Sequence, residues 1–251
     1  MTPSAAGRLV ILAGPSCVGK SPLDRALARL HPDLHRRLHK VVLFNSRDPR
    51  PGERDAVDYH FRSRPNNEAL RPQERFAVLD VRGDLQALDL SELATLLERG
   101  DAFFEGNPFV GRLLQTHPAL AQVRRLSVFL APLSKDEILF LKDPARNLSL
   151  PDLVTDVMRR KLLRRTRRQK GELSLKDLEN IERRAGSAFR ELQEAVHFDW
   201  VLPNHDGEDS DNWEAFYYPL GDARRALLAF ADLLEGRVPS CTEKWEAGLL
   251  D

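Results

Sequence analysis

The sequence predicts an α/β fold with a mainly parallel sheet, helices on both faces of the sheet, and a helical lid. Short apolar runs alternate with longer amphipathic segments, and the first apolar run ends in a glycine-rich turn that leads into a helix. A long, strongly basic helical stretch follows in the second half of the chain. Alternating strands and helices are typical of parallel sheets, because neighbouring parallel strands need a crossover connection between them.

The individual elements follow from hydrophobic periodicity and from the positions of glycine and proline. Apolar runs predict strands at 8–14, 41–44, 75–81, 101–106, 125–132 and 198–207. Amphipathic patterns predict helices at 22–30, 90–100, 151–194 and 221–236. The sequence has no internal repeat or low-complexity tract, so we expect one domain. Its main part is 1–206, and 207–251 adds a loop, a closing helix and a tail.

The composition argues against several classes of protein. The 251 residues carry 38 Lys and Arg against 38 Asp and Glu, whereas binding to nucleic-acid phosphates usually shows a basic excess. Cys17 and Cys241 are far apart and lack metal-ligand spacing, which fits a reducing compartment. Residues 1–14 have neither a signal-peptide pattern nor a membrane span. We therefore expect a cytoplasmic monomer or homodimer that binds neither nucleic acid nor a membrane.

The stretch from Gly14 to Ser21 has the pattern G-x-x-x-x-G-K-S of a phosphate-binding loop. It lies between a predicted strand and a predicted helix, the context that the pattern requires, and it predicts the three-layer fold of P-loop NTPases. Lys20 is expected to reach the β- and γ-phosphates of ATP, and Ser21 to bind Mg²⁺. The expected nucleotide-binding residues of the loop are Gly14, Pro15, Ser16, Cys17, Val18, Gly19, Lys20 and Ser21.

Two residues at this loop are unusual. Pro22 has no backbone N–H, but proline is well tolerated in the first turn of a helix. The loss of one hydrogen bond is expected to weaken nucleotide binding without abolishing it. Cys17 lies near a helix N-terminus, which can lower the pKa of a thiol. The alternative, a small residue that fills space, is the favoured interpretation.

A second motif, SRDPRPGERDAVDYHF at 46–61, carries two arginines three residues apart. The guanidinium groups of Arg47 and Arg50 can each bind phosphate oxygens in pairs, and a rigid loop lowers the entropy lost in holding them. Tyr59 adds a hydroxyl donor. The residues that stiffen the loop are Pro49, Pro51 and Gly52. The alternative is a solvated loop whose arginines pair with the neighbouring acids Asp48, Glu53 and Asp55.

Together the two motifs resemble the guanylate kinase family, whose acceptor loop has the form T-R-x-P-R-x-G-E-x-x-G-x-D-Y-x-F. The matching residues are Arg47, Pro49, Arg50, Gly52, Glu53, Asp58, Tyr59 and Phe61. Later segments, VFLAPLS and IERRAGSAFRELQEAVHFDWVLPN, also resemble the family, so the resemblance covers most of residues 8–206. It places the acceptor-binding part at about 44–90 and the lid at about 142–184, lengthened by an insertion after Leu141.

The resemblance implies a kinase that uses ATP and Mg²⁺. It would transfer the γ-phosphoryl group to a phosphate on a small acceptor, a nucleoside monophosphate that is GMP or a non-GMP relative. Arg47, Arg50 and Tyr59 would hold the acceptor phosphate.

The resemblance also suggests which other residues act on the donor. Lys20, Arg168 and Arg184 would stabilise the transferring group, with Arg167 as the alternative to Arg168. Asn204 would lie beside the donor adenine, although asparagines at strand ends are more often turn formers.

The segment that reads guanine departs from the family pattern. The family form F-x-E-x-A-x-x-x-G-N-Y-Y-G-[ST] corresponds here to FAVLDVRGDLQAL at 76–88. Ala77 replaces the glutamate that reads guanine, Gln86 the second tyrosine and Leu88 the hydroxyl residue. Glu105 is the one candidate for the family's aspartate after the fourth strand. Each lost hydrogen bond to a charged group costs about 1.5–3 kcal/mol, so we expect GMP to be a poor substrate.

Two other functions stay open. The chain could be a catalytically silent module that binds a nucleotide or a protein, although the intact G-K-S argues against this, or a nucleotide-gated switch without an acceptor. The acidic stretch DGEDSDN at 206–212 lacks the spacing of a calcium loop and is expected to be solvated. The tail could dock on the domain or contact a partner through Trp245.

Overall fold

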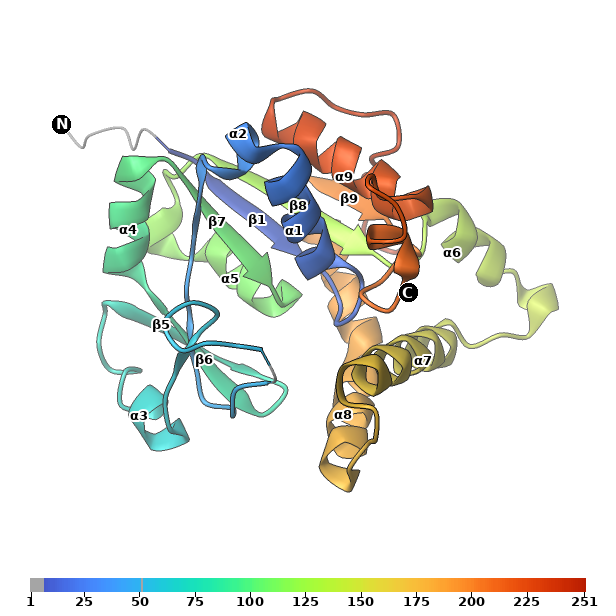
Figure 1. Cartoon of the computed structure of the whole chain (residues 1–251), viewed down its shortest axis with the longest axis horizontal. Helices are drawn as coiled ribbons and strands as arrows, with labels where there is room; N and C mark the ends of the chain where they lie inside the picture. Colours follow the sequence, from blue (N-terminus) through green and yellow to red (C-terminus); the bar gives the residue numbers. More distant parts are fainter. Residues whose placement is uncertain (1–6, 51) are drawn as a thin grey trace.

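A computed structural model describes residues 7–50 and 52–251, so residues 1–6 and the loop-stiffening Pro51 lie outside the described part of the chain. The main sheet has five strands in the order β2-β7-β1-β8-β9, and every neighbouring pair is parallel (Figure 1). The strands are β1 (Leu9–Ala13), β2 (Leu38–Lys40), β7 (Asp101–Gly106), β8 (Arg125–Ala131) and β9 (Trp200–Pro203). The predicted mainly parallel sheet is confirmed.

Helices cover both faces of this sheet, because alternate residues of its buried strands point to opposite sides. Val10 and Leu12 of β1 pack with the apolar residues of α1 and α9, whereas Leu9 and Ile11 pack with those of α5 and α8. The helices that bear on the main sheet are α1 (Lys20–Leu30), α5 (Pro108–Thr116), α8 (Leu175–Gln193) and α9 (Gly221–Leu234). The three-layer arrangement therefore follows from two separate apolar cores.

A second, four-stranded sheet lies below the first in Figure 1, in the order β4-β3-β6-β5. Its elements, with the flanking helices, are β3 (Phe44–Asn45), β4 (His60–Phe61), α3 (Arg64–Glu68), β5 (Phe76–Val81), β6 (Asp84–Asp89) and α4 (Leu90–Arg99). The strand predicted at 41–44 was wrong: the chain leaves the main sheet after β2 and joins the second sheet only at β3. The strand predicted at 75–81 is confirmed, and β6 pairs antiparallel to it.

The long helix predicted at 151–194 is two helices, α7 (Leu150–Lys170) and α8, packed side by side across from the second sheet (Figure 1). The break has a local cause. Gly171 ends α7 with a positive φ of 75°, and Ser174 begins α8 with a capping box to Asp177. The remaining elements are α2 (Pro32–His35), α6 (Lys135–Leu141) and 3₁₀ turns at Pro118–Leu120, Pro144–Arg146, Glu194–His197 and Asp211–Trp213.

The C-terminal tail docks on the domain. Glu243 forms an antiparallel bridge with Val201 at the edge of the main sheet, and the Glu243 carboxylate accepts hydrogen bonds from the backbone of Lys135 and the indole of Trp245. Trp245 is buried. Within residues 7–50 and 52–251, no helix combines the length and the apolar character needed to cross a membrane.

Candidate active site

The phosphate-binding loop connects β1 to α1 as predicted. Its backbone turns through left-handed conformations at Cys17 and Gly19, with φ values of 69° and 105°. A Cβ atom at Gly19 would lie 2.7 Å from the side chain of Asn204, so only glycine fits there. Pro22 lies in the first turn of α1, where a backbone N–H has no partner within the helix. The missing N–H therefore does not interrupt the helix.

Lys20, Ser21 and Glu105 lie together at the mouth of this loop. The Lys20 ammonium is buried and donates to the carbonyl oxygens of Gly14 and Pro15, at 2.9 and 2.8 Å. The Ser21 hydroxyl donates to Oε1 of Glu105 at 2.9 Å. Burial lowers the pKa of Lys20 and raises the pKa of Glu105. Glu105, the candidate for the family's aspartate, thus lies at the end of β7 beside the phosphate loop.

The thiol of Cys17 is not activated. Its side chain is fully buried, and burial together with the charge of Glu208 raises its pKa to about 12. The idea that this pKa is lowered was wrong, because burial of the thiol and the charge of Glu208 raise it. Cys17 fills space at a position whose positive φ favours glycine.

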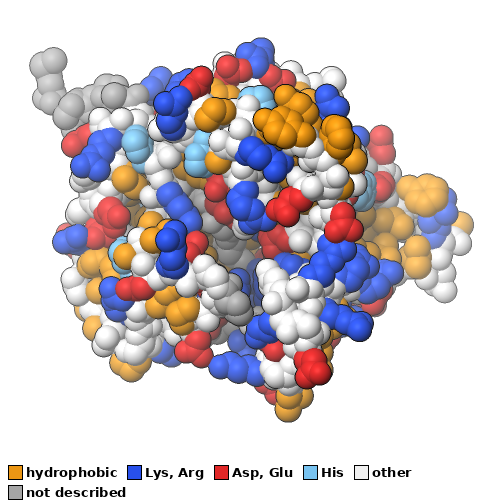
Figure 2. Space-filling view, in the orientation of Figure 1, with side chains coloured by type: hydrophobic (Ala, Val, Ile, Leu, Met, Phe, Trp, Pro, Cys, Tyr) orange, Lys and Arg blue, Asp and Glu red, His pale blue; other side chains and the backbone are white. Residues whose placement is uncertain are grey.

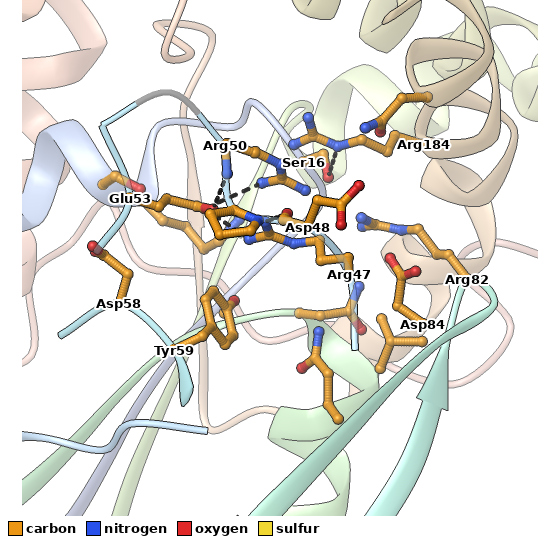
Figure 3. Close-up of a pocket in the computed structure, with 18 of the residues that line it drawn as sticks. Ser16, Arg47, Asp48, Arg50, Glu53, Asp58, Tyr59, Arg82, Asp84 and Arg184 are labelled. Carbon is orange, nitrogen blue, oxygen red and sulfur yellow. Dashed lines mark hydrogen bonds and ion pairs between the residues drawn. The ribbon is translucent and has the colours of Figure 1, made fainter. Parts of the chain in front are cut away.

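Arg47 and Arg50 lie in the predicted acceptor loop, but they are not equivalent (Figure 3). Arg47 donates two hydrogen bonds to Glu53, at 2.6 and 2.7 Å, and its guanidinium lies 5.1 Å from the ring centre of Tyr59. The alternative of arginines paired with local acids therefore holds for Arg47, whose side chain is nevertheless only 11% exposed and not solvated. Asp55 pairs with Arg62 instead.

Arg50 keeps more of its charge uncompensated. Its backbone N–H donates to the Glu53 carboxylate at 2.7 Å, but its guanidinium comes no closer than 3.9 Å to that carboxylate. The Nε atom of the guanidinium has no hydrogen-bond partner among the described residues. Burial and the nearby charge of Arg47 lower the pKa of Arg50 to about 10. A guanidinium held close to other cations is stabilised when an anion binds between them.

The phosphate loop and the acceptor loop line one cavity of about 580 Å³. Figure 2 shows Lys and Arg side chains around the hollow between the second sheet and the α7–α8 pair. The cationic lining residues are Lys20, Lys40, Arg47, Arg50, Arg82, Arg165, Lys170, Lys176, Arg183 and Arg184. The acidic lining residues are Asp48, Glu53, Asp58, Asp84, Glu105, Asp177 and Glu208. The cavity is therefore basic in a chain of zero net charge, as expected for a site that binds anions.

The structure places one predicted lid arginine in the cavity and the other outside it. Arg184 is buried, and its Nε donates to Ser16 of the phosphate loop at 2.9 Å. Arg168 is exposed and pairs with Asp211 at 2.9 Å, so it does not face the phosphates as expected. Arg167 is also exposed. Among the arginines of α7, the one that lines the cavity is Arg165.

Asn204 is fully buried beneath the phosphate loop. Its amide nitrogen donates to the carbonyl oxygens of Val18 and Asp206, at 2.8 and 2.7 Å. Its Oδ1 atom has no partner in the part of the chain that the structure describes. These contacts hold the loop against the segment that follows β9.

Sequence reasoning missed three site residues. Arg165 and Glu208 pair at 2.7 Å, and both line the cavity. Arg82 adopts a positive φ of 59° at the β5–β6 turn and pairs at 2.5 Å with Glu191, which is completely buried in α8. The position of Glu191 on the apolar face of α8 could have indicated a cationic partner, because a buried carboxylate needs one. Arg165 carried no such signal, because it is one of six arginines in α7.

The region that corresponds to the guanine reader is apolar. Ala77 pairs with Leu88 across β5 and β6, and both are buried. The space beside them, also bordered by Leu79, is too small for a water molecule. Gln86 is the one polar side chain in that lining among the described residues.

The hydroxyl of Ser21 and the carboxylate of Glu105 fit a Mg²⁺ ion. Both are hard oxygen ligands, and the ion commonly takes one or two protein ligands and completes its shell with water and phosphate oxygens. The described residues contain no group of three or more His, Cys, Asp or Glu side chains that could hold a metal by themselves. Any Mg²⁺ here would therefore arrive with a phosphate ligand.

Comparison with known proteins is consistent with this site. No protein-family model matches the chain. A guanylate kinase from Synechococcus sp. (strain JA-3-3Ab) is 31% identical over 218 residues, which cover 86% of this chain and 85% of that protein. A guanylate kinase from Mycobacterium bovis is 52% identical, but over 59 residues, 24% of this chain and only 26% of that relative.

The solved structures agree at the level of the fold. A crystal structure of guanylate kinase from Anaplasma phagocytophilum has a TM-score of 0.53 and 14% sequence identity, and the match covers 94% of this chain and 89% of that one. The extended similarity to the Synechococcus protein, joined to the phosphate and acceptor loops described above, decides the family. The chain belongs to the guanylate kinase family.

Proposed function

We propose that the protein is a phosphotransferase that moves the γ-phosphoryl group of Mg·ATP to a phosphate on a small acceptor. The observation that carries the proposal is the single cavity that contains both Lys20 with Ser21 and Arg47 with Arg50. A donor phosphate held by the first pair and an acceptor phosphate held by the second would share one water-restricted, basic site. Positioning and charge stabilisation are most of what phosphoryl transfer needs.

The residues have distinct roles in this proposal. Lys20, Arg184 and Arg165 stabilise charge on the transferring group, and Arg165 takes the place first given to Arg168. Ser21 and Glu105 hold Mg²⁺, which when bound neutralises charge on the donor phosphates. Tyr59 donates to the acceptor phosphate alongside the acceptor-loop arginines. No general base is required, since a phosphate acceptor is already ionised at neutral pH.

The acceptor proposed is a phosphorylated compound that is not read through a guanine edge. Ala77 and Leu88 present no hydrogen-bonding group, so the polar edge of guanine would be left without partners on burial. A nucleoside monophosphate other than GMP is the acceptor that we favour, and Gln86, which also lines the larger cavity, is a candidate to contact its base.

The test is the release of ADP from Mg·ATP against a panel of GMP, dGMP, other nucleoside monophosphates and sugar phosphates. The Lys20→Ala variant is the blank. We expect turnover with one acceptor class, little with GMP, and none in the variant. Efficient turnover of GMP would show that the base is read by residues other than those at the family positions. Bound ATP with no turnover on any acceptor would favour the silent binding module instead.

A further inference from the structure

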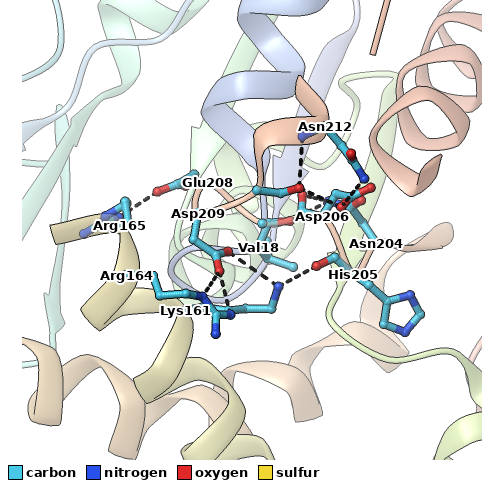
Figure 4. A network of polar contacts seen from close by, with 12 residues as sticks. Val18, Lys161, Arg164, Arg165, Asn204, His205, Asp206, Glu208, Asp209 and Asn212 are labelled. Atoms are coloured by element: carbon cyan, nitrogen blue, oxygen red, sulfur yellow. Dashed lines mark hydrogen bonds and ion pairs between the residues drawn. The ribbon is translucent and has the colours of Figure 1, made fainter. Parts of the chain in front are cut away.

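The segment between β9 and α9 lies directly on the phosphate-binding loop. The backbone N–H of Glu208 points to the carbonyl oxygen of Cys17, with the two atoms 3.4 Å apart. A Cβ atom on Gly207 would lie 2.2 Å from that same oxygen, so the approach requires glycine. Residues 205–211, which we call the acidic loop, therefore lie against the phosphate-binding loop (Figure 4).

One side chain of the acidic loop enters the cavity. The Glu208 carboxylate is 17% exposed and accepts a hydrogen bond from Arg165 at 2.7 Å. Burial raises the pKa of Glu208, but the charges of Arg165 and Lys20 outweigh it and bring this pKa to about 2. A full negative charge therefore stands among the cations that line the phosphate end of the cavity.

The acidic loop is also fastened to the lid. Asp209 is buried and lies 2.7 Å from Arg164 and 3.6 Å from Lys161 (Figure 4). Asp211 pairs with Arg168 at 2.9 Å. Part of the basic charge of α7 is therefore paired with the acidic loop. These contacts also hold Glu208 in place without help from a ligand.

We propose that Glu208 is a specificity-determining residue of the donor site: its carboxylate takes the position of an anion beside Arg165 and Lys20, and a donor binds by displacing it. This inference rests on the proposed donor site. Because the carboxylate must leave before a ligand binds, the apparent affinity is the intrinsic affinity multiplied by the fraction of molecules in which the site is open. A ligand must then offer enough phosphate charge to outcompete the carboxylate, which selects polyphosphates over single anions.

The test measures the affinity of the full chain for Mg·ATP and for inorganic tripolyphosphate by calorimetry, before and after Glu208→Gln. The variant keeps the size of the side chain and removes its charge. We expect both ligands to bind at least about tenfold more tightly, because the competing anion is gone. We also expect the melting temperature without ligand to fall, because Arg165 loses its partner. Damage to the fold would instead lower both the affinity for the ligands and the melting temperature.

The matched control is Asp211→Asn, which neutralises an exposed acid of the same loop outside the cavity. We expect the affinities of this variant for both ligands to stay within about twofold of those of the original chain, because an exposed ion pair contributes little. If the original chain binds Mg·ATP through Lys20 but Glu208→Gln binds it equally or more weakly, the inference is overturned and the proposed function stands. If none of the proteins binds either ligand, the donor site itself is refuted, and the inference with it.

Discussion

The cavity contains a phosphate region, formed by Lys20, Arg47 and Arg50. Next to the cavity, Ala77 and Leu88 form what we call the base region, at the positions that correspond to the guanine reader. The cations of the first region are held against nearby acids or carbonyl oxygens, and several of them lie close enough to shift one another's pKa. The base region is a tight apolar contact with no space for a ligand. On the proposed function, this difference leads us to expect recognition of ligands chiefly by their phosphates, with little recognition of a guanine edge.

The largest predicted effect is a difference in phosphotransfer rate between substitutions of Arg165 and of Arg168, two arginines of α7. Arg165→Ala removes a cation that lines the cavity, and we expect phosphotransfer to fall by about 100- to 1,000-fold, as for loss of a group that stabilises the transition state. Arg168→Ala removes an exposed ion pair and should change the rate less than about fivefold. Steady-state kinetics with the acceptor found in the panel measures both. Equal losses in the two variants would mean that the lid rearranges to bring Arg168 inward.

The acceptor side of the phosphate region is tested by Arg50→Ala. We expect kcat/KM for the acceptor to fall about 100-fold, chiefly through KM, because hydrogen bonds from a guanidinium to a phosphate contribute about 1.5–3 kcal/mol each. The KM for ATP should change little. Arg54→Ala, an exposed arginine of the same loop, is the control. If Arg50→Ala left the acceptor KM unchanged while ATP hydrolysis continued, the nucleotide-gated switch would be the better description.

The base region can be tested by restoring a carboxylate. Ala77→Glu places a charge in the tight contact with Leu88, and we expect it to lower the free energy of unfolding by an amount on the order of 3 kcal/mol, because nothing there can pair with it. Urea denaturation measures this, with Ala77→Val as the control for added volume. A variant that keeps its stability and gains turnover of GMP would show that the base region opens to admit guanine, against the comparison drawn above.

Much of the phosphate region was predictable from sequence, and the reason is local geometry. The residues of G-x-x-x-x-G-K-S are contiguous, so the strand before Gly14 and the helix after Lys20 place them with no information from elsewhere. The acceptor arginines were found in the same way, within one short loop. The departure at Ala77 was visible as a missing charge in an otherwise recognisable pattern.

The lid and the second sheet were less predictable, because their geometry depends on residues far apart in the chain. The pairing of Arg165 with Glu208 spans 43 positions, and nothing local distinguishes Arg165 from the other arginines of α7. The short strand β3 has two residues, too few for a periodic signal. The acidic stretch at 206–212, which carries Glu208, was expected to be solvated, and its partners on α7 could not be identified from the sequence.

A smaller effect, which depends on pH, should come from the attachment of the acidic loop. His205 lies between Asp222, at 2.5 Å from its Nδ1, and Glu137, at 2.9 Å from its Nε2, while Arg225 pairs with the same aspartate. Burial lowers the pKa of His205, but the two carboxylates raise it by more, so its value lies above the ordinary 6.5. The charged imidazolium is therefore favoured in the folded protein.

The sign of the pH dependence follows from this shift. A raised pKa contributes stability that is fully present below about pH 6.5 and is lost as the pH rises through the folded-state value. We therefore expect His205→Gln to lower the melting temperature by a few degrees at pH 6 and by much less at pH 9, as measured by differential scanning calorimetry. His197→Gln, at an exposed histidine, is the control. A loss of the same size at both pH values would mean that His205 acts through packing, and that the carboxylates beside it do not hold the acidic loop by charge.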